Sequence, residues 1–217
     1  KVLIAYVPAG SEKSWKYVEA FDTKGNIHQL DVNKAPNHQV IIVGLNSKKD
    51  MNAGLKLMNE KLRLAGMQKT APKTREPMEV SKLNYIRLND DKEPWVLGDA
   101  EIYVMVDGIA PEADKASIIA IELPYLDHDG KDYHPNQVLI VWNNYRYMAA
   151  NLNFYEHDDN TNYKEIVAGL ISALGQVAPE YQNITDIASK IIQLMPDKWF
   201  SNDDDYVDVY YTLEKGK

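Results

Sequence analysis

Apolar and polar residues alternate along several short stretches of this chain. Between positions 100 and 106, Ala100, Ile102, Val104 and Val106 alternate with Glu101, Tyr103 and Met105. A period of two is typical of a half-buried strand. The same kind of pattern, with continuous apolar runs, predicts strands over residues 2–7, 16–22, 26–31, 39–45, 83–88, 100–106, 117–123, 138–142, 151–156 and 206–213.

Three stretches repeat with helical spacing instead. Met51, Leu55, Met58 and Leu62 fall on one stripe of a helix within residues 50–64, and Gly66 follows as a typical terminating residue. Apolar positions predict two further helices at about 163–177 and 185–195. Asn162 is the expected N-cap of the first of these.

The order of these elements predicts two parts and a linker. Residues 1–66 form a small β-hairpin plus helix segment, and residues 67–82 are polar, proline-bearing and without periodicity, as a linker is. Residues 83–217 alternate short strands with turn-rich connections. The expected fold class is mainly β (α+β), a β-sandwich with inserted helices that is preceded by a small α/β segment.

Charge is distributed unevenly between the two parts. The net charge is −8, yet residues 1–82 carry +6 and residues 83–217 carry −14. Eleven of the 24 acids of the second part gather in four short loops, at 89–91, 127–132, 156–159 and 203–205. Calcium takes six to eight oxygen ligands, largely from such loops, so the pattern indicates a calcium-binding, β-rich module. It also argues against nucleic acid as a partner.

The loop Asp127-His128-Asp129-Gly130-Lys131-Asp132 is a separate candidate for metal binding. It does not match an EF-hand, because a lysine and a valine stand where ligands are required. An acidic hairpin turn is the first interpretation. The alternative is a transition-metal site in which His128 and His134 bind together with these aspartates.

Signatures of catalysis are missing from the sequence. It contains no cysteine, and no nucleophile elbow, His-Glu-x-x-His, P-loop or dinucleotide-binding glycine pattern. An enzyme is therefore the less favoured interpretation. The alternatives left open are a glycosidase-like hydrolase with paired carboxylates, and a metal-free protein or glycan interaction domain that uses aromatic residues such as those at 142–147.

Two segments resemble the C2 domain, a calcium-binding β-sandwich. They are Gly98-Asp99-Ala100-Glu101-Ile102-Tyr103-Val104 and Leu152-Asn153-Phe154-Tyr155-Glu156-His157-Asp158, within residues 83–165. The resemblance implies a Ca²⁺ cofactor bound at one end of the sandwich. Its implied ligands are Asp90, Asp99, Glu156 and Asp158, with Asp159 and Asp91 as alternates. The predicted helix at 163–177 departs from the family, which continues there as a strand.

The whole chain also resembles a family of uncharacterised exported bacterial proteins. Lys1 rather than methionine opens the sequence, so we expect a mature product from which a signal peptide was removed. The expected location is extracytoplasmic, in the periplasm or at the cell surface. The expected function is a non-enzymatic, calcium-dependent binding or structural module of the cell envelope. Its partners would be a glycan, a protein or a membrane surface, and the oligomeric state is not indicated.

Overall fold

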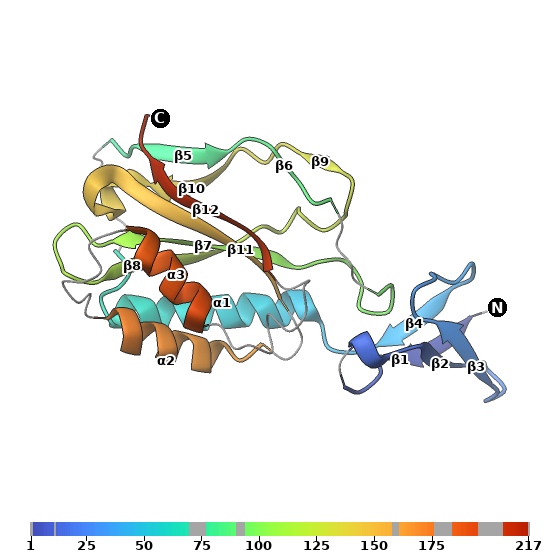
Figure 1. Cartoon of the computed structure of the whole chain (residues 1–217). Helices are drawn as coiled ribbons and strands as arrows, with labels where there is room; N and C mark the ends of the chain where they lie inside the picture. The colour runs from blue at the N-terminus through green and yellow to red at the C-terminus, as the bar shows by residue number, and fades with distance from the viewer. Residues whose placement is uncertain are drawn as a thin grey trace.

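The computed structural model describes residues 2–10, 12–69, 77–89, 94–157, 161–175, 184–194 and 206–216. Strands and three helices pack together as a β-rich α+β fold, which confirms the predicted fold class. A small sheet lies to one side of a larger body, and the first long helix leads from one to the other (Figure 1). Among the described residues, no helix is both long enough and apolar enough to cross a membrane.

The small sheet is formed by the first 43 residues. Its strands are β1 (Leu3–Tyr6), β2 (Tyr17–Phe21), β3 (Ile27–Asp31) and β4 (Val40–Val43), in the order β3-β2-β1-β4. β4 runs parallel to β1, whereas the other neighbours are antiparallel. A one-turn helix, η1 (Glu12–Ser14), lies between β1 and β2.

The body is built on a four-stranded antiparallel sheet in the order β12-β11-β7-β8. Its strands are β7 (Ile102–Ile109), β8 (Ala116–Glu122), β11 (Ala149–Glu156) and β12 (Tyr206–Glu214). The alternation at 100–106 predicted a strand with one solvent-exposed face, and this is wrong. Every residue of β7 is buried. Tyr103 and Met105 pack against the helices in one hydrophobic core, whereas Ile102, Val104 and Val106 belong to a second core on the other face of the sheet.

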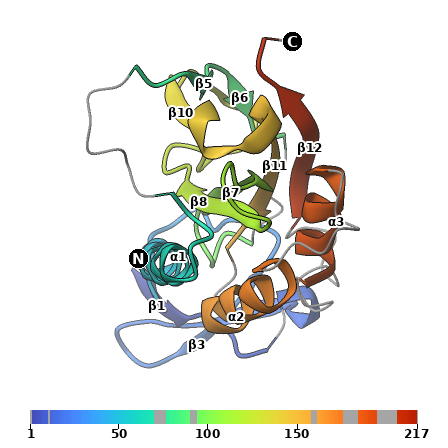
Figure 2. The ribbon, with the colours of Figure 1, turned by 90° about the vertical axis from the view of Figure 1, so that its left-hand side faces the viewer.

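Three helices cover one face of this sheet (Figure 2). They are α1 (Ser47–Leu64), α2 (Tyr163–Leu174) and α3 (Ile184–Leu194). The predicted stripe of α1 is buried as expected, and its four residues join the same core as the helix-facing side of β7. Asn46 caps α1 by accepting a hydrogen bond from Lys49 N at 2.9 Å.

Short strands and turns cover the opposite face. β5 (Val80–Leu83) pairs with β10 (Gln137–Val141), and β6 (Ile86–Arg87) pairs with β9 (Asp132–Tyr133). Two 3₁₀ turns, η2 (Trp142–Asn144) and η3 (Arg146–Met148), follow β10. Trp142 and Tyr145 are buried there in a second core. They therefore belong to the packing rather than to an exposed aromatic surface.

Packing contacts cross the expected linker between the two parts. α1 lies in the first part by sequence, yet it packs in the core of the body. Just beyond α1, the carbonyl of Met67 accepts a hydrogen bond from Ile118 N of β8 at 2.8 Å. Residues 70–76 of the linker lie outside the described residues. The division at 67–82 stays a prediction.

Candidate functional site

The candidate site lies where β7 begins and β8 ends. These strands are antiparallel neighbours, so the loop before β7 and the loop after β8 meet at one end of the sheet. Leu123 N donates to Ile102 O at 2.9 Å and extends the ladder by one step. A tight turn follows, closed by Leu126 N and Leu123 O at 3.0 Å. This turn directs the chain toward the acidic loop at 127–132.

Three potential metal ligands meet at this end. One ligand atom from each of Asp99, Asp127 and His128 lies within 4.8 Å of those of the other two. Nδ1 of His128 is 3.3 Å from Oδ1 of Asp99, and both side chains are more than half exposed. Two carboxylates and one imidazole are a donor set that suits divalent cations.

The carboxylate of Asp127 is held by a neighbouring hydroxyl. Tyr133 OH donates to Oδ1 of Asp127 at 2.7 Å, and the ammonium group of Lys131 lies 4.7 Å from the centre of the Tyr133 ring. Slight burial raises the pKa of Asp127, but the hydrogen bond from Tyr133 and the charges of His128 and Lys131 outweigh it and the net pKa is lowered. Asp127 is therefore ionised and oriented, as a metal ligand must be.

A small cleft adjoins the cluster. Its volume is ≈ 80 Å³, and it is lined by α1, the start of β7 and the end of β8. Four carboxylates line it: Asp99, Glu101, Glu122 and Asp127. Lys48 and Met51 of α1 also line it. Asn52 donates to Oε1 of Glu122 at 3.1 Å, which leaves the second oxygen of that side chain for another interaction.

The structure describes only some of the residues for which calcium ligation was predicted. Asp99 belongs to the cluster. Glu156 pairs with Ile102 in the β11–β7 register, which places it at the same end of the sheet, but it is not a member of the cluster. Asp90, Asp91, Asp158 and Asp159 lie outside the described residues.

The loop at 127–132 contributes only part of its acids to the cluster. Asp132 instead accepts hydrogen bonds from Tyr85 OH at 3.0 Å and from Arg87 at 3.4 Å. His134, the second histidine of the transition-metal alternative, lies 3.3 Å from Asn84 O. Sequence reasoning had named Asp99 and His128 for two separate sites. The antiparallel pairing of two consecutive strands was the clue that could have joined them.

A second carboxylate and histidine pair, Asp50 and His157, lies between β11 and the helices, and the side chain of His157 is buried. Nδ1 of His157 is 2.9 Å from Tyr163 OH, and its Nε2 is 3.6 Å from Oδ2 of Asp50. The rings of His157 and Tyr163 stack at 5.7 Å. These contacts join the end of β11 to α1 and α2. Burial raises the pKa of Tyr163, so this tyrosine stays a neutral hydroxyl.

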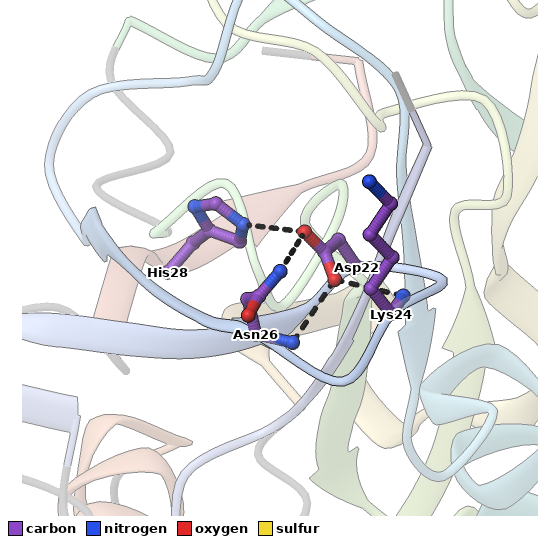
Figure 3. A network of polar contacts seen from close by, with 4 residues as sticks. All are labelled: Asp22, Lys24, Asn26 and His28. Atoms are coloured by element: carbon purple, nitrogen blue, oxygen red, sulfur yellow. Dashed lines mark hydrogen bonds and ion pairs between the residues drawn. The ribbon is translucent and has the colours of Figure 1, made fainter.

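A third carboxylate and histidine pair occurs in the β2–β3 hairpin (Figure 3). Asp22 accepts from the backbone N–H of Lys24 at 2.9 Å, from both nitrogens of Asn26 at 3.0 Å and from Nε2 of His28 at 3.3 Å. The hydrogen bond from the Asn26 side chain is the largest cause that lowers the pKa of Asp22. Both carboxylate oxygens of Asp22 accept hydrogen bonds within the hairpin, so this pair stabilises the turn and is not a candidate binding site.

Comparison with known proteins supplies a family but no activity. No curated protein matches the chain. No solved structure matches it either. One family model covers the chain from residue 1 to residue 217. The chain belongs to the family described as "Protein of unknown function (DUF3103)".

Proposed function

We propose that this protein is a non-enzymatic binding module that holds a divalent cation, calcium in the first place, at the end of its central sheet. The observation that supports the proposal is the convergence of Asp99, Asp127 and His128 from two loops onto one point. The cation would neutralise carboxylates that repel one another and would order the two loops. The ordered loops would then form the surface that meets a glycan, a protein or a membrane.

The oxygen atoms around the cleft are numerous enough for calcium. Asp99 and Asp127 offer four carboxylate oxygens between them, and Glu101 and Glu122 line the same cleft. Water can complete a shell of six to eight ligands. The imidazole of His128 makes zinc or another transition metal the competing ion, because these ions accept nitrogen ligands readily.

Exposure of the ligands favours weak binding. Asp99 and His128 are more than half exposed, so the affinity should fall in the range of extracellular calcium modules, with a dissociation constant of about 10⁻⁴–10⁻³ M. Such an affinity suits an extracytoplasmic location, which is part of the proposal. The likeness to C2 domains is part of it too. Acidic loops at one end of a sheet support that likeness, whereas α2 occupies the position where that family has a strand.

The size of the cleft supports binding rather than hydrolysis. Pockets that hold small-molecule substrates measure about 300–1,000 Å³, whereas this cleft measures ≈ 80 Å³. The smaller volume suits an ion with a few waters, each of which occupies about 30 Å³ in the liquid. A glycosidase would need a groove between its two acids that accommodates a sugar ring.

Thermal unfolding in EDTA, followed by titration with calcium, magnesium and zinc, tests the proposal. An ion that binds only the folded state stabilises it by about 2.7 kcal/mol at 100 times its dissociation constant. For a chain of this size we expect the melting temperature to rise by about 5–11 °C, at about 2–4 °C per kcal/mol. Isothermal titration calorimetry would give the stoichiometry, which should be one ion per chain.

Two substitutions that each remove one negative charge distinguish coordination of the cation from a general attraction to the acidic loop. Asp127→Asn should abolish the saturable shift. Asp129→Asn changes the same charge in the same loop, outside the cluster, and should leave the shift intact. If only zinc raises the melting temperature and His128→Ala abolishes that shift, the bound ion is a transition metal and not calcium. A flat response to all three ions would show the proposal to be wrong.

A further inference from the structure

The small N-terminal sheet has an exposed apolar face. On each strand, large apolar residues point away from the body, and six of them are 44–59% exposed: Ile4, Tyr6, Tyr17, Ile27, Ile41 and Val43. The strand register places them on one side of the sheet, since Ile4 pairs with Phe21 and Ile41, and Phe21 pairs with Ile27. We call these six residues the apolar face.

The other side of the same sheet packs into a small core. Leu3, Ala5, Val18 and Ala20 are buried there against Val32 and Val96. A sheet with one solvated side normally carries polar residues on it. β1 and β4, with sequences LIAY and VIIV, are instead apolar on both sides. This pattern is typical of strands that are buried on both faces of a sheet. Nothing in the described part of the chain covers the apolar face.

Polar groups are confined to one corner of this side. The row Ile27, Phe21, Ile4, Ile41 crosses all four strands without a charge. In the next row, Glu19 and Gln29 lie on β2 and β3, whereas Tyr6 and Val43 lie on β1 and β4. The uncharged area therefore extends to β4, which is an edge strand of the sheet. A second copy can meet this area without burying an unpaired charge.

The area of the face matches what a dimer needs. An aromatic side chain offers about 150–250 Å² and an aliphatic one less, so these six, two of them aromatic and each about half exposed, offer at most roughly 500–800 Å². Stable interfaces bury about 600–1,000 Å² on each partner. The four strands contain no Lys or Arg, which would be needed to attract anionic lipid headgroups. A protein surface is the better occupant than a membrane.

We propose that this chain forms a two-fold symmetric dimer in which the apolar faces of two copies pack against each other. The two sheets lie about 10 Å apart, as in a β-sandwich. The symmetry axis lies in the interface over β1 and β4, so that Glu19 of each copy stays at the solvated rim. Such an isologous contact is the commonest form of homo-oligomer.

Sedimentation equilibrium across a concentration series tests the dimer. The chain should show a monomer–dimer equilibrium, and Ile41→Lys should weaken dimerisation at least tenfold. Leu64→Lys is the matched control, because Leu64 is 66% exposed on α1, outside the apolar face. It should leave dimerisation unchanged. Circular dichroism would verify that both variants are folded.

Cross-linking gives a second, independent test. The chain has no cysteine, so Ile4→Cys provides one thiol at the centre of the proposed interface and Leu64→Cys provides one outside it. A short bismaleimide should link Ile4→Cys into dimers and leave Leu64→Cys as monomers. A chain that is monomeric at all concentrations would overturn the proposal. So would a monomer that sediments with phospholipid vesicles, or a dimer that tolerates Ile41→Lys.

Discussion

Nδ2 of Asn153 lies 2.5 Å from Oδ2 of Asp107 in the interior of the body. In this orientation the amide donates to Asp107, while its own Oδ1 is buried and has no hydrogen-bond partner among the described residues. Asn151 donates to the other carboxyl oxygen at 2.7 Å. Asp107 is fully buried and neither amide carries a charge, so burial favours the neutral acid on β7.

The free energy of unfolding should depend on pH through Asp107. Burial raises the pKa of this group from 3.8 to about 7, although hydrogen bonds from Asn151 and Asn153 lower it in part. The folded protein therefore keeps the proton up to about pH 7, whereas the unfolded chain releases it near pH 4. At about 1.4 kcal/mol per unit, stability should fall by up to about 4 kcal/mol as the pH rises from 4 to 7. Urea unfolding at a series of pH values measures this.

Asp107→Asn identifies the group responsible, since asparagine does not titrate. Its stability should change less between pH 4 and pH 7 than that of the wild type. Asp114→Asn is the control, because Asp114 is exposed and paired only with Arg146 at 3.1 Å in the described structure, and it should keep the wild-type slope. Equal slopes for the wild type and Asp107→Asn would refute the assignment.

Gly54→Ala should destabilise the protein, although alanine is the better helix former by about 1 kcal/mol. A Cβ atom at Gly54 would lie 2.0 Å from Cδ2 of Tyr163, because the tyrosine ring rests on α1 at this point. Overpacking of this kind costs about 1–3 kcal/mol. Thermal or urea unfolding gives the difference from the wild type.

A double-mutant cycle isolates the cause of that loss. With Tyr163→Leu in place the ring is gone, and Gly54→Ala should then cost much less. If alanine costs the same in both backgrounds, the contact with Tyr163 is not what requires glycine at this position.

Local periodicity was sufficient to predict most of the helices and strands. α1 was expected because four apolar residues share one stripe, and the β2–β3 hairpin because strands were predicted at 16–22 and 26–31. The burial of β7 on both sides was missed. The second side of β7 contains a tyrosine and a methionine, and alternation alone does not reveal that helices from distant parts of the chain cover them.

The candidate site was predictable in its chemistry but not in its geometry. Loop acids and His128 were recognised as ligand types from composition. Their grouping depends on which strand ends meet, and that follows from the pairing of β7 with β8. Asp132 is as acidic as Asp127 in sequence, yet Arg87 and Tyr85 engage it instead. The spacing of residues in the sequence does not show that Tyr85 and Arg87, in and beside β6, lie next to Asp132.

Asn46→Ala should lower stability by about 1 kcal/mol, because the N-cap hydrogen bond to Lys49 N at 2.9 Å is lost and an N–H at the helix start is left without its acceptor. Chemical denaturation measures the effect. Asn46→Asp keeps an acceptor at the same position and adds favourable charge near the helix N-terminus. It should restore stability, so an equal loss in both variants would exclude capping as the explanation.

Tyr133→Phe should weaken cation binding while the ligands themselves stay in place. The hydroxyl of Tyr133 orients Asp127 through a 2.7 Å hydrogen bond, and the loss of such an outer-shell partner typically costs about 10–100-fold in affinity. Tyr125→Phe is the matched control, because its hydroxyl donates to Gln137 at 2.6 Å instead of to a ligand. Calorimetric titration of both variants with calcium should therefore separate them by at least tenfold. Equal affinities would mean that Asp127 is oriented by the loop backbone or does not bind the cation at all.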